Sequence, residues 1–218
     1  MELKKALEER RAIRGFTSDP VSQETLREVL RLGTRAISAV NSQPWEFAVV
    51  TGDILKALCE DNIACLQNNL PKDLQDLYPD GVYRTRRIEV AKQLFASMGI
   101  ERGDAEKRDW WNQRGYRFFD APAGIVLYMD RSLKDLYRFD MGCVAQNICL
   151  AAMEFGLGTC VEYQVVMYER GLRQILNIPE NKELICGIAI GYPDWSFPAN
   201  NVISSREDVD ALTTWYGF

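Results

Sequence analysis

The chain has 218 residues, of which 47% are hydrophobic and 26% are charged, and its formal net charge is −5. This composition is typical of a globular protein with one large domain, or at most two small ones. The negative charge argues against a nucleic-acid partner, because binding to phosphates needs a basic surface. The sequence contains no histidine, which excludes Ser-His-Asp and Cys-His nucleophile systems and most catalytic zinc and non-haem iron sites. The chemistry must therefore come from other side chains or from a cofactor.

The start of the chain carries no recognisable targeting signal. Its sequence, MELKKALEERR, is charged throughout and lacks the apolar core of a signal peptide. The longest apolar runs, such as residues 123–129, are far too short to span a bilayer. The six cysteines form no C-x-x-C pair, which argues against a zinc site and favours reduced thiols. We therefore expect a cytoplasmic protein with no membrane partner and no bound metal.

Two helices are predicted near the N-terminus. Leu3, Ala6 and Leu7 fall at helical spacing, which predicts a short amphipathic helix that ends near Gly15. Ser22 is a plausible N-cap for a second helix, because apolar residues follow it at i, i+3 and i+4 spacing. A buried strand is then expected at residues 46–52, followed by a further helix from about residue 53.

The pattern becomes irregular, polar and aromatic over residues 71–119. This region contains one helical-looking run, RIEVAKQLFASMGI, between stretches rich in arginine, tryptophan and tyrosine. Long insertions in compact domains usually carry function. We therefore predict a lid or insertion here.

Regular alternation returns after residue 119. Apolar runs predict strands at residues 123–129, 159–163 and 184–192, and helical periodicity predicts a long helix that Gly156 and Gly158 stop. A shorter helix should end before Pro179, and residues 193–218, which have little periodicity, should form a C-terminal extension. Helices that alternate with apolar strands predict one layered α+β domain over residues 1–218.

Three arginines stand close together in RRAIRGF, residues 10–16. One interpretation is that they are cations at a helix C-terminus, where open carbonyl groups favour them. The alternative is an extended segment in which Arg10, Ala12 and Arg14 point the same way. Arg10 and Arg14 would then stand about 13 Å apart, which suits an elongated anionic ligand.

A second polar motif, SAVNSQPWEF, covers residues 38–47. Ser38, Asn41 and Gln43 supply hydroxyl and amide groups that could recognise a flat heterocycle rich in donors and acceptors. A polar turn that precedes a strand is the alternative.

Taken together, these motifs resemble the FMN-dependent nitroreductases. The resemblance covers nearly the whole chain and includes RRAIRGF, NSQPW, FFDAPAGIVL and GLGTCVEY. The insertion and the C-terminal segment GYPDWSFPANNVISSREDVDALTTWYGF are most similar to the subgroup that acts on nitrobenzoates and related nitroaromatics. The resemblance implies an α+β sandwich with a mixed central sheet, which forms an intertwined homodimer with one FMN at each subunit interface.

The resemblance also implies which residues bind FMN. They come from both ends of the chain and from loops between them, at Arg10, Arg11, Ala12, Arg14, Ser38, Asn41, Gln43, Glu162, Tyr163 and Arg206. Arg10 and Arg11 match contacts to phosphate and ribityl, Arg14 matches the cation near the pyrimidine edge, and Arg206 matches a basic residue that returns to the phosphate. The family usually has serine in place of Ala12, so one hydroxyl contact is missing.

The other FMN contacts follow from the same comparison. Ser38, Asn41 and Gln43 match the segment that reaches FMN, with Ser38 coming from the partner subunit. Glu162 and Tyr163 match the loop whose backbone lies over the flavin N5 edge.

The implied mechanism is ping-pong: NADH or NADPH reduces the flavin, and a nitroaromatic substrate then takes electrons in pairs. Because flavin N5 carries the hydride transfer, we assign no catalytic side chain. The predicted lid supplies the candidate substrate contacts, at Tyr83, Arg84, Trp110, Trp111 and Tyr116. The alternative, that these side chains only pack within the lid, stays open for each of them.

Two further functions remain compatible with the sequence. One is a different flavoenzyme on the same scaffold, such as a quinone, flavin or enone reductase or a reductive dehalogenase. The other is a non-catalytic FMN-binding redox protein. No segment distinguishes NADH from NADPH as the electron donor.

Overall fold

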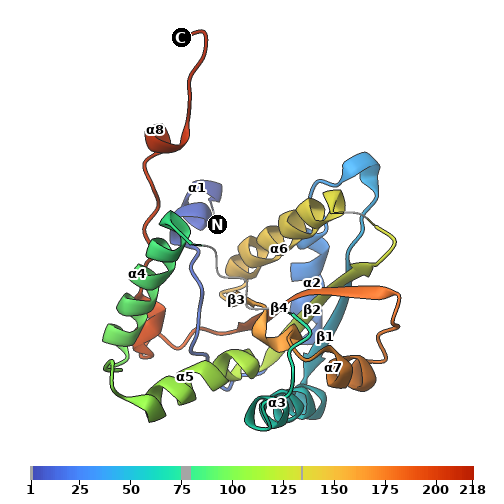
Figure 1. The fold of residues 1–218 in the computed structure, drawn as a ribbon. Helices are drawn as coiled ribbons and strands as arrows, with labels where there is room; N and C mark the ends of the chain where they lie inside the picture. Colours follow the sequence, from blue (N-terminus) through green and yellow to red (C-terminus); the bar gives the residue numbers. More distant parts are fainter. Residues whose placement is uncertain (1, 75–79, 134) are drawn as a thin grey trace.

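A computed structural model describes residues 2–74, 80–133 and 135–218. Its centre is a four-stranded sheet with the order β1-β2-β4-β3 (Figure 1), formed by β1 (Glu46–Thr51), β2 (Ala123–Asp130), β3 (Gly158–Glu162) and β4 (Lys182–Gly191). All three pairings between these strands are antiparallel. Parallel pairing is limited, within the described residues, to one isolated bridge between Ala12 and Thr159. The expected mixed sheet is therefore wrong for the four strands themselves.

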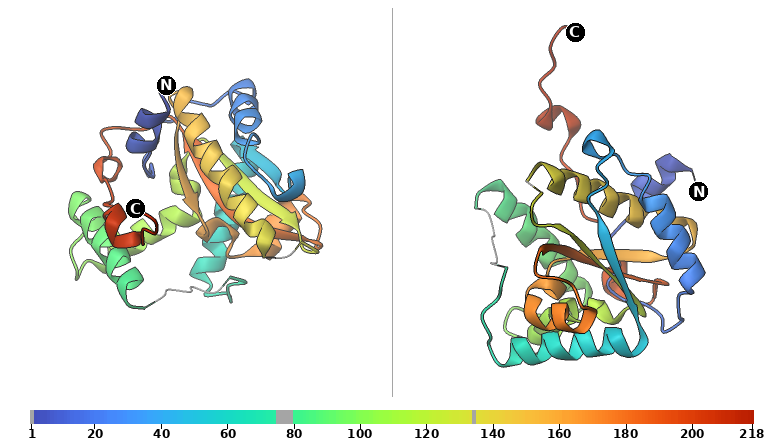
Figure 2. Two further views of the ribbon diagram at one scale, coloured as in Figure 1. Left: turned by 90° about the horizontal axis from the view of Figure 1, so that it is seen from above. Right: turned by 90° about the vertical axis from the view of Figure 1, so that its right-hand side faces the viewer.

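Helices cover both faces of this sheet (Figure 2). On one face lie α2 (Gln23–Gly33) and α6 (Leu136–Glu154), and on the other lie α3 (Gly52–Gln67) and α7 (Glu169–Leu176). Side chains of β2 alternate between the two: Ile125 belongs to the core on the α6 side, and Val126 to the core on the α3 side. Because both faces are buried, β2 reads as a continuous apolar run. The expected α+β sandwich is confirmed.

Local signals in the sequence explain where the helices of this sandwich begin and end. Ser22 caps α2, since its side chain accepts a hydrogen bond from the Thr25 amide. Gly33 allows α2 to approach α6, because a Cβ there would lie 2.5 Å from Ile148 Cγ1. Gly156 follows α6 with a φ of 70°, the left-handed conformation typical of a helix C-terminus. The predicted boundaries of these helices are confirmed to within a few residues.

The first helix is shorter than predicted. Helix α1 (Leu3–Glu9) ends before the arginines, and Arg10 is extended, with φ −57° and ψ 124°. The predicted end near Gly15 is wrong because tertiary pairing competes with the helix: the Ile13 amide donates to the Thr159 carbonyl at 2.9 Å. Ile13 itself is 3% exposed. Burying it against β3 requires an extended chain.

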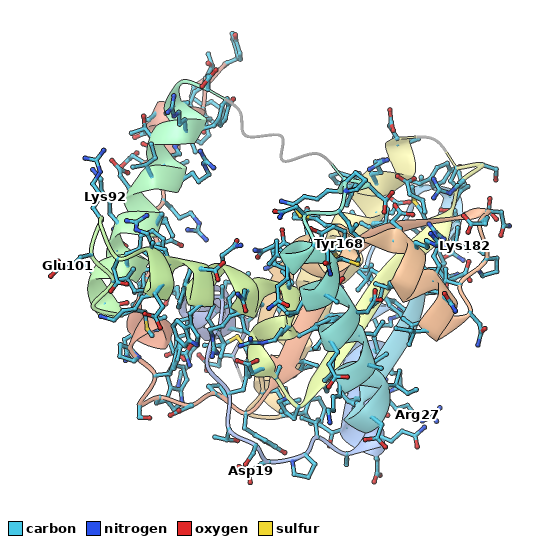
Figure 3. The ribbon with its side chains drawn as sticks, turned by 60° about the horizontal axis from the view of Figure 1, so that its bottom comes forward. Asp19, Arg27, Lys92, Glu101, Tyr168 and Lys182 are labelled. Atoms are coloured by element: carbon cyan, nitrogen blue, oxygen red, sulfur yellow. The ribbon has the colours of Figure 1, made fainter. Side chains whose placement is uncertain are left out.

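Two further helices project from one side of the sandwich (Figure 1). They are α4 (Val82–Ser97) and α5 (Ala105–Tyr116), which we call the arm. In Figure 3, Lys92 and Glu101 of this region lie on the opposite side of the molecule from Lys182, at the start of β4. The arm falls within the insertion predicted at residues 71–119, of which residues 75–79 lie outside the described part.

The C-terminal segment leaves the sandwich after β4. It passes the short helix η4 (Pro198–Asn201) and then α8 (Val209–Leu212), and it ends well away from the sheet (Figure 1). Large apolar side chains on it face outward, and Trp215, Tyr216 and Phe218 are 58%, 83% and 102% exposed. Among the described residues, none of the helices is both apolar and long enough to span a membrane.

Candidate functional site

A cavity of about 410 Å³ opens beside the arginine segment. Arg10 and Arg11 line one side, and the C-terminal half of α6 and the start of β3 line the other. Pro193 and Trp195, from the segment after β4, close it, and the Arg11 guanidinium lies 5.7 Å from the Trp195 ring. The extended interpretation of residues 10–14 is therefore the one that the structure favours.

Arg14 lies further along the same extended segment. Its backbone amide donates to Asn200 Oδ1 at 2.7 Å, and its carbonyl accepts from Arg114 Nη2 at 2.8 Å. Its guanidinium lies 5.9 Å from the Phe119 ring and is half-buried. The side chain therefore extends from a backbone that is held on both sides.

The predicted arginines share one electrostatic property. Within the described residues, neither Arg10, Arg11, Arg14 nor Arg206 forms an ion pair with a carboxylate. By contrast, Arg173 is paired with Glu169 at 2.5 Å. Arg10 and Arg11, which line the cavity without a carboxylate partner in the described chain, suit an anionic ligand held by charge-assisted hydrogen bonds.

Glu162 ends β3 on the side of the sheet that faces α3. It is 5% exposed, and neither of its carboxyl oxygens has a hydrogen-bond partner in the described chain. Burial raises the pKa of this carboxyl well above its ordinary value, and the nearby Arg14 charge opposes this only in part. A buried polar group without a partner is uncommon and indicates a ligand or an ordered water beside it. The adjacent Tyr163 is 60% exposed.

The loop that carries Ser38, Asn41 and Gln43 is held by α6. Asp140, 3% exposed, accepts a hydrogen bond from the Ala39 amide at 3.1 Å. The Ser38 hydroxyl oxygen accepts a hydrogen bond from the backbone amide of Gln43 at 3.2 Å. Asn41 and Gln43 have φ values of 58° and 47°, and both are exposed. The loop is therefore a fixed turn whose amide side chains face away from its own subunit.

This loop and the arginine cavity lie at opposite ends of α6. Asp140 is in the second turn of the helix, whereas Met153, at its C-terminal end, lines the cavity. Thirteen residues at 1.5 Å per residue separate them by about 20 Å along the helix axis. One chain thus brings Arg10, Arg11 and Arg14 together, and leaves Ser38, Asn41 and Gln43 far from them.

Arg206 is also apart from the cavity. It is exposed, and its Nη1 donates to the neighbouring Ser204 and Ser205 carbonyls at 3.2 and 2.9 Å. In the described part of the chain, Pro193 and Trp195 of the C-terminal segment line the cavity, and Arg206 does not. Ala12 is used in the bridge to Thr159.

The five candidate substrate contacts are divided by burial. Tyr116 is 2% exposed, with its hydroxyl 3.4 Å from Met167 Sδ, and Trp111 packs between the rings of Phe95 and Phe119 at 6.5 and 6.2 Å. Tyr116 therefore packs inside the chain, and Trp111 packs on neighbouring rings while part of its surface stays accessible. The burial of Tyr116 leaves its ring no surface for a substrate.

The other three candidates lie on the surface of the arm. Tyr83 is 62% exposed, Trp110 is 39% exposed, and Arg84 lies 3.7 Å from Asp80 in an exposed ion pair. An exposed pair at this distance contributes little, so Arg84 is available to another anion.

Two residues that hold the arginine segment were missed by sequence reasoning. Asn200 and Arg114 hold the backbone of Arg14, but no motif in PANN or NQRGY indicates this. Their role comes from contacts between segments 100 residues or more apart, which periodicity does not report. The described part of the chain contains no group of three or more Cys, Asp or Glu side chains that could hold a metal ion.

These residues fit FMN on structural grounds. Arg10 and Arg11, which have no carboxylate partner among the described residues, suit the phosphate of FMN. Strand β3 begins at the cavity and ends at Glu162, whose carboxyl group has no hydrogen-bond partner in the described chain and could bind a polar group of the cofactor. Cys160 and Cys186 do not suggest other redox chemistry, because burial raises the pKa of each thiol to about 12.

Comparison with known proteins agrees with this geometry. The family model "Nitroreductase family" matches residues 7–192. The chain is 34% identical over 215 residues to a nitrobenzene nitroreductase from Ectopseudomonas oleovorans, covering 96% of this chain and 94% of that protein. It is 31% identical over 214 residues to a 4-nitrobenzoate reductase from Nocardioides sp. (strain LMS-CY), covering 94% and 86%.

Solved structures show the same relationship. The FMN and NADPH-dependent nitroreductase NfnB from sphigopyxis sp. strain HMH superposes with a TM-score of 0.95 at 32% identity, covering 100% of both chains. The FMN-dependent nitroreductase NfnB from Mycobacterium smegmatis, in complex with NADPH, gives a TM-score of 0.90 at 29% identity, covering 98% of this chain and 97% of that one. This chain therefore belongs to the nitroreductase family.

Proposed function

We propose that this protein is an FMN-dependent oxidoreductase that uses NADH or NADPH to reduce nitroaromatic compounds. The observation that carries the proposal is the cavity lined by Arg10 and Arg11, which have no carboxylate partner within the described chain. The names of its relatives, which include a nitrobenzene nitroreductase and a 4-nitrobenzoate reductase, support the substrate class.

Bound FMN would supply hydride transfer, which no side chain of this protein can provide. Arg10 and Arg11 would hold the phosphate by charge-assisted hydrogen bonds. Arg14, half-buried and fixed at its backbone, would place a positive charge near the pyrimidine edge. That charge favours the reduced cofactor, because reduction adds negative charge there.

Glu162 would contribute by staying neutral. A carboxylate at this position would oppose the effect of Arg14, but burial raises the Glu162 pKa and favours the protonated form. Its two oxygens are then one donor and one acceptor for the isoalloxazine ring or for a water beside it.

A homodimer would complete the site. The Ser38–Gln43 loop lies about 20 Å along α6 from the cavity, so a second copy is needed to bring these side chains to the same FMN. Apolar side chains around that loop are exposed in the single chain: Ile37 at 69%, Val40 at 94% and Phe139 at 65%. A patch of this kind is typical of an interface.

The C-terminal extension packs on its own chain as far as Asn200, and its later part, residues 203–218, would cover the second copy. A groove of about 620 Å³ runs between α2 and the edge strand β1, lined by Phe47, Val49 and two arginines, Arg27 and Arg31. The extension combines exposed aromatic side chains with acidic residues, so it complements this groove in both polarity and charge. Arg206 would approach the phosphate within the same assembly.

The arm would form one wall of the substrate site as a lid. Tyr83 and Trp110 present exposed rings on which a nitroaromatic can stack. Arg84 would attract a carboxylated substrate, since its pair with Asp80 is weak and exposed. We also propose a cytoplasmic location, because all six cysteines are free thiols.

Anaerobic titration of the purified protein tests this function. A yellow protein should lose its flavin absorbance when NADH or NADPH is added and regain it with nitrobenzene or 4-nitrobenzoate. Parallel additions of a quinone, free flavin and an enone compare the alternative acceptors. A colourless protein that does not bind added FMN would refute the proposal, and flavin that neither nucleotide reduces would indicate a non-catalytic binding protein.

A further inference from the structure

Arg114, in the last turn of α5, is an unusual arginine because it is almost entirely buried, at 8% exposure. Its Nη2 donates to two carbonyl groups, that of Arg14 at 2.8 Å and that of Phe119 at 3.0 Å. Its Nη1 pairs with Asp120 Oδ2 at 2.7 Å. One guanidinium therefore connects the arm to the segment that carries the cofactor-binding arginines.

Two aromatic rings lie against this guanidinium. The Trp110 ring is 5.2 Å away and the Phe197 ring is 4.8 Å away. Phe197 belongs to the segment after β4, and it also packs against Gly15, where a Cβ would lie 2.3 Å from Phe197 Cγ. Arg114 thus sits where three parts of the chain meet: residues 14–15, the arm, and residues 194–200.

Asn200 also binds the backbone of residues 14–15. It is 0% exposed, and its Oδ1 accepts from the amides of Arg14 at 2.7 Å and Gly15 at 3.1 Å. Its Nδ2 donates to the carbonyls of Gly15 at 2.7 Å and Asp194 at 2.8 Å. The amide and the carbonyl of Arg14 are therefore both bound by buried side chains.

We propose that Arg114 is a positioning residue for Arg14: it holds the Arg14 carbonyl from the arm and so sets where the Arg14 guanidinium meets the FMN pyrimidine edge. This inference rests on the proposed function. It also connects the two halves of the reaction, because Trp110, a proposed substrate contact, packs directly on Arg114.

Replacing Arg114 with methionine removes the donors but keeps an apolar stem between Trp110 and Phe197. The carbonyls of Arg14 and Phe119 then lose this donor, and the segment shifts towards new partners. A hydrogen bond to a charged group contributes about 1.5–3 kcal/mol, and losing about 1.4 kcal/mol changes an equilibrium constant tenfold. We expect the FMN dissociation constant to rise about tenfold and the equilibrium constant for two-electron reduction to fall about tenfold, equal to about 30 mV.

The experiment measures FMN affinity by fluorescence and the midpoint potential of bound FMN by equilibration with a reference dye. It compares wild-type protein with Arg114→Met, Arg14→Met and the double variant. If Arg114 acts through Arg14, adding Arg114→Met to Arg14→Met should not change the potential further. Arg108→Met is the matched control, because Arg108 is on the same helix and packs on Phe95 at 4.6 Å, away from Arg14.

Each outcome decides the matter. Wild-type affinity and potential in Arg114→Met, or an equal extra loss in the Arg14→Met background, would overturn the inference and leave the proposed function standing. Wild-type protein that binds no FMN would overturn both. If Arg114→Met does not fold, Arg114→Lys replaces it: a single ammonium group does not reproduce the fork to two carbonyls and a carboxylate, so a lower potential is still expected and an unchanged one refutes the role.

Discussion

Replacing Glu162 with glutamine tests whether an isolated carboxyl group is buried inside the folded chain. The pKa of this carboxyl is higher in the folded protein than in the unfolded chain, because burial disfavours the charged form. Above the unfolded-state pKa, the folded protein therefore binds more protons than the unfolded chain, and its stability falls as pH rises until the folded-state pKa is passed. Glutamine has no such proton, so the variant lacks this loss.

The size of the effect follows from the two oxygens without partners. Leaving a buried neutral polar group unsatisfied costs about 1–3 kcal/mol, a cost that the glutamine amide also carries, and an ionised carboxylate costs more. The difference at pH 8 is this extra cost of the charge, about 1.4 kcal/mol for each unit between the folded-state and unfolded-state pKa. The positive charge of Arg14 stabilises the ionised Glu162 carboxylate and so reduces this cost in the wild-type protein. We expect Glu162→Gln to be about 1–3 kcal/mol more stable than wild type at pH 8, equal to about 2–4 °C in Tm for each kcal/mol in a chain of this size. Below the ordinary pKa of a glutamate the advantage should disappear.

Urea unfolding of FMN-free protein between about pH 3.5 and 8.5, at one fixed protein concentration, measures this difference on both sides of the ordinary glutamate pKa. Glu60→Gln is the matched control: its side chain is 68% exposed and it should change stability little at any pH. A Glu162→Gln effect that does not vary with pH, or a variant less stable than wild type at pH 8, would refute the reasoning.

Three further predictions concern other parts of the structure. Arg10→Met should raise the FMN dissociation constant by about tenfold or more at low salt and less at high salt, as fluorescence titration can show; equal effects at both would argue against a phosphate contact. Arg173→Met should lower the free energy of unfolding by about 3–5 kcal/mol, measured by thermal unfolding. The reason is that the Glu169 carboxylate and the carbonyls of Pro179 and Lys182 lose their buried cationic partner, and a change below about 1 kcal/mol would contradict this. Removing residues 203–218 should shift sedimentation towards the monomer, and an unchanged dimer would show that this segment does not cover the second copy.

Much of the architecture follows from short-range patterns. The strands at residues 46–51 and 123–130 are apolar runs next to turn residues, and the capping hydroxyl of Ser22 marks where α2 begins. These signals act within a few residues, so a single sequence is enough to interpret them. The presence of three arginines in five positions, without histidine anywhere, likewise directs the chemistry towards an anionic cofactor.

The end of α1 shows where such patterns fail. Nothing local distinguishes a helix that continues through RRAIR from one that ends at Glu9. The decision depends on Ile13, which pairs with Thr159 and is buried against a strand about 145 positions away. A long-range pairing overrides a local preference because it buries an apolar side chain and satisfies backbone groups at once.

The candidate site divides in the same way. From the residues and the family resemblance, the arginines that line the cavity and the polar loop at Ser38 could be named in advance. Only the tertiary structure placed that loop at the far end of α6, left Glu162 without a partner and brought Arg114 and Asn200 onto Arg14. Residue types determine what chemistry is available, whereas distances between remote segments depend on how the helices and the sheet pack together.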